Sequence, residues 1–177
     1  MREDWKGRPQ WTSTGDQPAG EMLVGGVLQL VAFVIEGQRY ALQLQRVERV
    51  LPMVAIASLP EAPAITLGVI NLHGSILPVV DLRRRFNLPP HEYGLTGRLL
   101  VVQTLQRRLG FPVDEVLGVL EVAAEGVTPP HTVLPGIGHV AGIVTLADGL
   151  LFIHDLDSVL SLHEEQSLSG ALEEMEG

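Results

Sequence analysis

One stretch of the sequence occurs twice, and this internal repeat constrains the fold more than any other feature. Residues 68–82, GVINLHGSILPVVDL, align without a gap with residues 142–156, GIVTLADGLLFIHDL. The identical pairs are Gly68 and Gly142, Leu72 and Leu146, Leu77 and Leu151, Asp81 and Asp155, and Leu82 and Leu156. In each copy two mainly apolar runs flank a short polar turn, a pattern typical of paired strands. The repeat therefore predicts two copies of one hairpin-rich unit.

Short apolar segments upstream extend the repeat. Residues 41–51, ALQLQRVERVL, resemble residues 110–120, GFPVDEVLGVL. Strands are expected at residues 27–35, 40–44, 47–53, 68–72, 76–80, 98–104, 108–112, 116–122, 142–146 and 150–153. Runs this short, separated by turn residues, favour small β-barrels over a parallel α/β sheet. We predict an all-β fold with a few short helices.

The residues that both copies share are best explained by folding. Asp81 and Asp155 each end a strand and begin a short helical segment. An N-cap worth about 1 kcal/mol explains such aspartates without a catalytic role, which is the alternative. Gly68 and Gly142 are expected at strand starts or bulges, where the backbone bends.

Residues that only the first copy carries mark the more promising site. The second copy has Thr145 and Ala147 where the first has Asn71 and His73. A function that is specific to this hairpin is therefore expected at Asn71, His73 and Gly74, together with the loop that precedes them.

Composition excludes several classes of function. The chain has 177 residues, 46% hydrophobic and 19% charged, which suits one or two small soluble domains with a real core. The net charge of −9 comes from 12 basic and 21 acidic residues, so the broad positive field that nucleic acid requires is not expected. Without cysteine there are no disulfides, Cys-ligated metals or thiol catalysis. No apolar run is long enough to insert into a membrane, and the opening residues are not a secretory signal, so a cytoplasmic protein is predicted.

Signatures of catalysis and of cofactor binding are missing from the sequence. None of the six histidines has the spacing of a metal site, and no nucleophile elbow, P-loop or dinucleotide fingerprint occurs. Asp114 and Glu115 are adjacent, so on a strand they would point to opposite faces. We expect a non-catalytic scaffold with no metal and no cofactor.

The two ends of the chain differ from the centre. Residues 1–25 lack an apolar period and are expected to form a flexible tail, in which Trp5 and Trp11 are either incidental or part of a docking peptide. Residues 163–177 are acidic, with Leu168, Leu172 and Met175 at helical spacing. They are expected to form an acidic tail or a frayed helix, because an isolated helix of this length is marginal.

One long segment resembles a known family. LGVINLHGSILPVVDLRRRF, residues 67–86, resembles the signature of the CheW-type chemotaxis coupling proteins, a G-x-x-N-L-R-G segment followed by P-x-V-D-L-R-x-x-F. The resemblance extends over about residues 27–162. It implies two five-stranded SH3-like barrels packed around a shared core. To these barrels the residue patterns add short helices and a C-terminal helix, which lies outside the resemblance. We accordingly assign a CheW-like domain to residues 26–162, with barrels at roughly 26–92 and 93–162, and leave open an exchange of strands between them.

The resemblance also implies a function. Such proteins are non-catalytic adaptors that bridge the cytoplasmic tip of methyl-accepting chemoreceptors and the regulatory domain of the chemotaxis histidine kinase. The protein would then be recruited to membrane-associated receptor arrays. Two alternatives stay open: a coupling subunit of a non-flagellar pathway, for surface motility or second-messenger control, and a barrel that binds a small molecule.

By the same resemblance, partner-binding candidates lie on two strands and one hairpin. They are Val47, Glu48, Arg49, Asn71, His73, Gly74 and Val119. The two valines occupy equivalent positions of the repeat and could instead belong to the core. Glu48 could be merely a solvated charge.

This chain departs from the family signature at one position. A glutamate, here Glu48, commonly faces an arginine of the N-L-R-G turn, but this chain has His73 at that place. Arginine carries a permanent charge and forks onto a carboxylate, whereas the charge of histidine changes near neutral pH. The pair is expected to be weak or pH-sensitive, unless Arg83 or Arg84 reaches Glu48. The alternative is that His73 is an exposed turn residue of no consequence.

Overall fold

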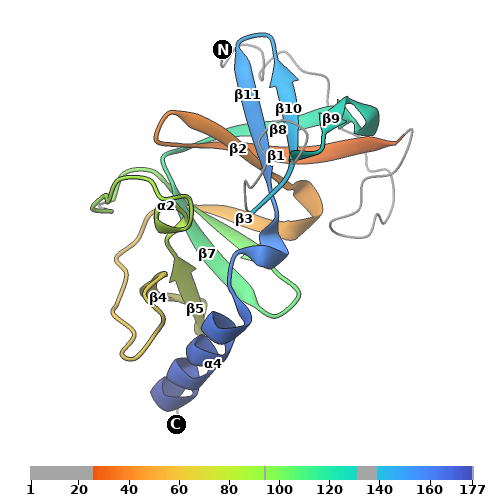
Figure 1. Ribbon diagram of the computed structural model, residues 1–177. Coiled ribbons are helices and arrows are strands. Elements are labelled where there is room, and N and C mark those ends of the chain that lie inside the picture. The colour runs from red at the N-terminus through yellow and green to blue at the C-terminus, as the bar shows by residue number, and fades with distance from the viewer. Residues whose placement is uncertain (1–25, 94, 131–138, 177) are drawn as a thin grey trace. The chain divides into compact units, whose positions relative to one another are not determined.

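The computed structural model describes residues 26–93, 95–130 and 139–176, with the side chains of these residues as far as 175. The expected N-terminal tail, with Trp5 and Trp11, lies outside the described residues. The strands are β1 (Val27–Ile35), β2 (Gln38–Gln43), β3 (Val47–Pro52), β4 (Thr66–Leu72), β5 (Ser75–Val80), β6 (Arg98–Gln103), β7 (Arg108–Val113), β8 (Glu115–Ala123), β9 (Val127–Thr128), β10 (Val140–Leu146) and β11 (Gly149–His154). The helices are η1 (Leu44–Arg46), α2 (Leu82–Arg85), η2 (Ala124–Gly126), η3 (Leu156–Ser158) and α4 (Leu162–Glu176) (Figure 1). The prediction of a mainly β fold is confirmed.

The strands form two sheets whose orders repeat each other. One is six-stranded, in the order β8-β1-β2-β11-β10-β9, and the other five-stranded, in the order β3-β6-β7-β5-β4. The β10–β11 hairpin pairs in parallel with β2, and the β4–β5 hairpin pairs in parallel with β7. The sixth strand, β9, has its counterpart in a single bridge between Ala57 and Val69. Both sheets are therefore versions of one SH3-like unit, as the internal repeat predicts.

Each sheet combines several strands from each half of the chain. The aligned segments 41–51 and 110–120 contain β3 and the first part of β8. β8 pairs with β1, whereas β3 lies beside β6. The chain accordingly divides into a first unit, residues 1–47 and 114–156, and a second unit, residues 48–113 and 157–177. This division differs from two contiguous halves that meet near residue 92, because β1 and β2 share a sheet with β8–β11, and β6 and β7 share the other sheet with β3, β4 and β5.

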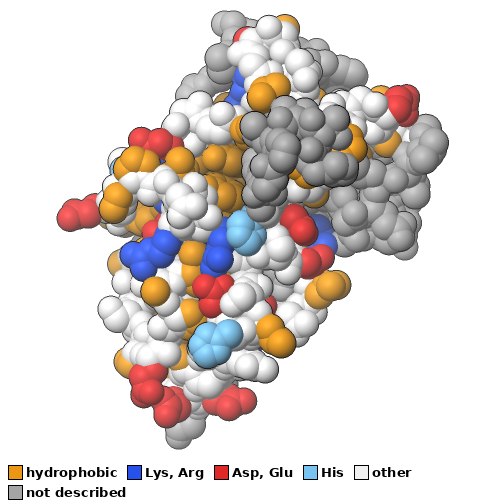
Figure 2. All heavy atoms as spheres, viewed as in Figure 1, with side chains coloured by type: hydrophobic (Ala, Val, Ile, Leu, Met, Phe, Trp, Pro, Cys, Tyr) orange, Lys and Arg blue, Asp and Glu red, His pale blue; other side chains and the backbone are white. Residues whose placement is uncertain are grey.

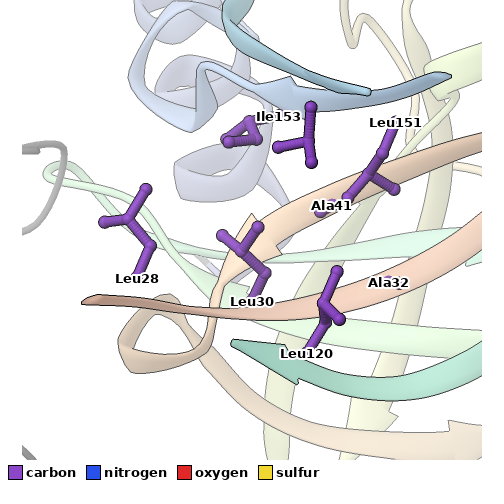
Figure 3. Close-up of a cluster of buried hydrophobic side chains, with 8 residues drawn as sticks. Leu28, Leu30, Ala32, Ala41, Leu120, Leu151 and Ile153 are labelled. Carbon is purple, nitrogen blue, oxygen red and sulfur yellow. The ribbon is translucent and has the colours of Figure 1, made fainter. Parts of the chain in front are cut away.

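Each unit has its own hydrophobic core. In the first unit β1 contributes every second residue, Leu28, Leu30 and Ala32, as expected for a strand with one buried face. Figure 3 shows these side chains pointing toward those of neighbouring strands, namely Ala41, Leu120, Leu151 and Ile153. The corresponding cluster of the second unit is Met53, Ile70, Leu72, Leu77, Val79, Leu99 and Val101. Burial of these apolar side chains is the main stabilising contribution to each sheet.

Gly68 lies where two backbone segments approach closely. The register of the β4–β5 hairpin shifts between Thr66 and Gly68, and the β10–β11 hairpin shifts at the equivalent place, between Val140 and Gly142. Gly68 has φ +152°, and a Cβ atom there would lie 2.1 Å from the carbonyl oxygen of Ala57. Only glycine fits this bulge, because any side chain would collide with backbone.

The two repeated aspartates have different surroundings. Asp81 is buried and is the N-cap of α2, where it accepts hydrogen bonds from the backbone N–H of Arg83 at 3.0 Å and from the Tyr93 hydroxyl at 2.8 Å. Asp155 is exposed and directly precedes η3, and its backbone N–H donates to the carbonyl of His139 at 2.8 Å. The hydrogen bonds from Arg83 and Tyr93 compensate for the burial of the Asp81 carboxylate.

The C-terminal segment forms a docked helix rather than a loose tail. Ser161 and Glu164 make a capping box: the Ser161 hydroxyl accepts from the Glu164 N–H, and the Glu164 carboxylate accepts from the Ser161 N–H. Glu164 also accepts two hydrogen bonds from Arg85, at 2.6 and 2.7 Å. Leu168 is fully buried, so α4 is fixed to the second unit by apolar packing as well as by charge.

A second arginine adds to this attachment. Arg107 donates from Nε to Glu165 at 2.8 Å and from Nη2 to the Ser169 hydroxyl. Among the described residues, no helix combines the length and apolar character that crossing a membrane would require.

The close approach at Gly68 gives a first prediction. Gly68→Ala should lower the free energy of unfolding by about 2–4 kcal/mol, because the new methyl group must displace backbone at a strained φ. Urea denaturation measures the change. Gly170→Ala is the control: this position in α4 has open space around it, so the variant should be more stable than wild type by about 0.5–1 kcal/mol. Equal stability of the two variants would contradict the assignment.

The attachment of α4 predicts a pH dependence. Burial acts to raise the pKa of Glu164, but hydrogen bonds from Ser161 and Arg85 and the charge of Arg85 outweigh it, so this pKa lies below its ordinary value of 4.5. A carboxylate with a lowered pKa in the folded state stabilises the fold above the ordinary value and loses that contribution as the pH falls through the lowered one.

Glu164→Gln should therefore lower the free energy of unfolding by about 1 kcal/mol at pH 7, and the difference from wild type should shrink as the pH approaches 3.5. Urea denaturation at both pH values measures it. Glu173→Gln, at an exposed position of the same helix, should show no such trend. A difference that is constant with pH would rule out the charged pair as its cause.

Candidate functional site

Three successive exposed residues of β3 form the first part of the site. Glu48, Arg49 and Val50 are exposed, and Val47, which begins the strand, is half-buried. β3 lies at one end of the strand order of its sheet. An exposed strand at the end of a sheet can present both charged and apolar side chains to a partner.

The β4–β5 turn forms the second part. His73 and Gly74 are its two central residues, with φ +52° and +87°, which is the pattern of a tight two-residue hairpin turn. The side-chain oxygen of Asn71 accepts a hydrogen bond from the Gly74 N–H at 2.8 Å. Asn71 and Gly74 thus set the shape of the turn, and His73 is exposed at its tip.

A contact between side chains joins the turn to β3. Arg49 Nη1 lies 3.2 Å from His73 Nε2. Because β3 and β4 are at opposite ends of the strand order, this contact brings the two ends of the sheet together, as in a barrel. Arginine can only donate, so His73 Nε2 accepts, which requires a neutral imidazole with its proton on Nδ1.

The expected pairing of Glu48 differs from the observed one. Its carboxylate lies 3.2 Å from Arg108 Nε and 3.7 Å from Arg49 Nε, so it pairs with these two arginines rather than with His73. Arg84 donates to the Ala64 carbonyl at 2.6 Å, and Arg83 is buried. We call Glu48, Arg49, Arg108 and His73 the β3 cluster.

Sequence reasoning missed Arg108, although the internal repeat carries a signal for it. The alignment of residues 41–51 with 110–120 places Arg39 opposite Arg108, and that of the hairpins places Asp148 opposite Gly74. In the first unit Arg39 is buried and pairs with Asp148 at 2.9 Å. The hydrogen bond from Arg39 holds the pKa of Asp148 below its ordinary value. In the second unit the turn has glycine instead of aspartate, and the equivalent arginine pairs with Glu48.

The remaining candidates lie elsewhere. Val119 is half-buried on β8 in the first unit, paired with Val31 of β1. Gly142 is buried at the bulge of β10. The structure therefore brings together Glu48, Arg49, Asn71, His73 and Gly74 within the second unit, and it adds Arg108 to them.

The surface of the described residues mixes charged and apolar side chains (Figure 2). On the face that Figure 2 shows, acidic, basic and histidine side chains lie among hydrophobic ones. Such a mixture is typical of interfaces between proteins that also exist apart. In the described part of the chain, no three acidic or histidine side chains are grouped so that they could hold a metal ion.

The contact at the turn predicts the tautomer of His73. Nitrogen NMR of the imidazole at neutral pH should show the proton on Nδ1, because Nε2 accepts from Arg49. Arg49→Gln replaces the guanidinium with a shorter amide and should return the ring to the mixture of tautomers found in an exposed histidine. A proton on Nε2 in the wild type would contradict the contact. His91, exposed in the loop before β6, is the internal reference.

Comparison with known proteins gives the family. The family model for the CheW-like domain matches residues 29–164. The chain is 27% identical to "Chemotaxis protein CheW" of Rhizobium meliloti (strain 1021), over 84% of this chain and 97% of that protein. It is 30% identical to the protein of the same name from Bacillus subtilis (strain 168), over 78% and 90% respectively.

A solved structure agrees with these sequence relatives. The crystal structure of the scaffolding protein TtCheW from Thermoanaerobacter tengcongensis has a TM-score of 0.69 and 28% identity, and the similarity covers 77% of this chain and 94% of that one. With the exchanged barrels, the repeated hairpins and a family model that spans most of the sequence, this chain belongs to the CheW-like domain family.

Proposed function

We propose that the protein is a non-catalytic adaptor that couples methyl-accepting chemoreceptors to a chemotaxis-type histidine kinase. The observation that carries the proposal is the β3 cluster, an exposed group of charged side chains on a rigid sheet. Three of its members, Glu48, Arg49 and His73, occupy positions that the family resemblance assigns to partner binding. The chain's membership of the CheW-like family supports the same role.

An adaptor requires two surfaces that can be occupied at the same time. The second unit offers the β3 cluster, with Val50 exposed beside it on the same strand. The first unit offers β8, a strand at the end of its sheet order, with Val119 half-buried. We assign the receptor tip to the β3 cluster, and we propose that β8 takes part in the remaining contacts. Simultaneous occupancy raises the effective concentration of one partner for the other without any chemical step.

The location of the protein follows from its partners. Binding to the cytoplasmic tip of a receptor would recruit a cytoplasmic protein to membrane-associated receptor arrays without any insertion into the membrane. In such an array the rigid turn around His73 and Gly74 would keep the β3 cluster in a fixed geometry for each receptor that it meets.

Charge reversal at Glu48 tests the receptor contact. Glu48→Lys places a third cation beside Arg49 and Arg108, so both guanidinium groups should move apart. We expect the full-length variant to lose at least about tenfold in affinity for a purified receptor tip and to keep its affinity for the purified kinase regulatory domain. Isothermal titration calorimetry measures both, and urea denaturation verifies folding.

Glu92→Lys is the matched control, since this residue is exposed in the loop before β6 and lies outside the β3 cluster. It should bind both partners as wild type does. Failure of the wild type to bind either partner would refute the adaptor proposal. Loss of both partners in a folded Glu48→Lys variant would refute the assignment of the receptor to this face.

A further inference from the structure

Within the β3 cluster, the carboxylate of Glu48 is already engaged. Its Oε1 atom faces Arg108 Nε at 3.2 Å, and its Oε2 atom faces Arg49 Nε at 3.7 Å. Both oxygens thus have a cationic neighbour. A partner's cation that approached Glu48 would have to compete with two arginines of the same unit.

Arg49, in contrast to Glu48, has hydrogen-bonding groups that its neighbours in the cluster do not use. Its Nη1 atom contacts His73 and its Nε atom faces Glu48, so neither of these two interactions uses Nη2. Its side chain is 43% exposed, compared with 34% for Glu48. A guanidinium has five N–H donors in one plane, so the contacts to His73 and Glu48 leave donors of this half-exposed side chain that a ligand can use.

The charges of the cluster do not cancel. The arginines contribute two positive charges, Glu48 contributes one negative charge, and His73 must be neutral to accept from Arg49. Arg108 neutralises Glu48, so the charge left at the surface is positive and lies on Arg49. The planar N–H groups of a guanidinium match a carboxylate in two parallel hydrogen bonds.

We propose that the β3 cluster recognises its partner through a carboxylate that binds Arg49, with Glu48 and His73 holding the guanidinium in place and Arg108 neutralising Glu48. The inference rests on the proposed function, since the partner is the receptor tip, and it adds the chemistry of the contact: an aspartate or glutamate of the receptor docks on this arginine. Arg108 is a positioning residue in this arrangement.

The first unit supports a dedicated role for Arg108. There the equivalent arginine, Arg39, is only 6% exposed and is held by the turn residue Asp148. In the second unit the side chain of Arg108 is 36% exposed, and its carboxylate partner belongs to β3, in the candidate binding site. The two copies thus use the same arginine position differently. Arg39 attaches a turn to its sheet, whereas Arg108 neutralises Glu48 on an exposed strand.

The test is calorimetric titration of the full-length protein with a purified receptor tip at low and high salt. Arg49→Gln should weaken binding by about tenfold and should reduce its salt dependence, because one ion pair is lost. Arg49→Lys should recover part of the affinity. Glu48→Gln should cost less than Arg49→Gln, since it removes no contact to the partner.

Arg108 is tested in the same titration. Arg108→Gln should weaken binding, because Glu48 then neutralises Arg49, and Arg108→Lys should restore it. Arg98→Gln is the control at an exposed arginine that donates only to the neighbouring Gly97 carbonyl. Urea denaturation of every variant separates lost binding from lost folding.

Two results would overturn the inference. One is an Arg49→Gln variant that binds like the Arg98→Gln control, and the other is a larger loss for Glu48→Gln than for Arg49→Gln, which would assign a partner's cation to Glu48. Both require that the wild type binds the receptor tip. If the wild type does not bind it, the proposed function fails instead.

Discussion

Each sheet of this fold combines strands from both halves of the chain, and the candidate site depends on this exchange. β3 comes from the first half but lies beside β6, while β8 comes from the second half and pairs with β1. The β3 cluster consequently combines Glu48 and Arg49 with Arg108 of β7, a strand of the other half. Without the exchange, Glu48 would have no arginine of that strand beside it.

The two copies of the repeat use equivalent arginines for different purposes, one to stabilise the fold and the other in the candidate binding site. In the first unit Arg39 of β2 is buried and forms an ion pair with Asp148, which attaches the β10–β11 turn to the sheet. In the second unit the turn has glycine at the equivalent position, and Asn71 takes over the support of the turn from within the hairpin. The arginine of β7 is then available for Glu48 on the exposed strand. The presence of Gly74 where the other copy has Asp148 thus leaves Arg108 able to pair with Glu48 at the surface.

Most of the fold follows from local patterns that a reader of the sequence can recognise. The repeat of residues 68–82, the alternation in β1 and the glycine at the bulge each reflect a constraint that acts within a few residues. For residues 163–177 the sequence predicts an acidic tail or a frayed C-terminal helix, although the SLHE motif at residues 161–164 is a capping-box signal for a stable helix start. The attachment of this helix could not be predicted, because Arg85 and Arg107 are distant in the sequence from their partners on α4.

The sequence predicts which residues lie near one another in the candidate site, but not which of their side chains form ion pairs. Glu48, Arg49 and the turn at His73 follow from the family resemblance, and the structure brings them together in one unit. From the sequence, the expected partner of Glu48 is His73 of the turn or, as the alternative, Arg83 or Arg84, which follow the hairpin closely in sequence. The arginine that the structure places beside Glu48 lies on β7, because strand order in the sheet, rather than distance along the chain, decides which side chains meet.

The exchange of strands also has a consequence for synthesis on the ribosome. Val27 pairs with Ala123, and β2 pairs with β11, so the sheet of the first unit cannot be completed before His154 has been made. The second unit needs α4, which ends at Glu176. Neither sheet can be completed before strands of both halves have been made, so the growing chain exposes open sheet edges until then. Open edges can pair with other chains, so this order of synthesis favours aggregation over folding until the missing strands arrive.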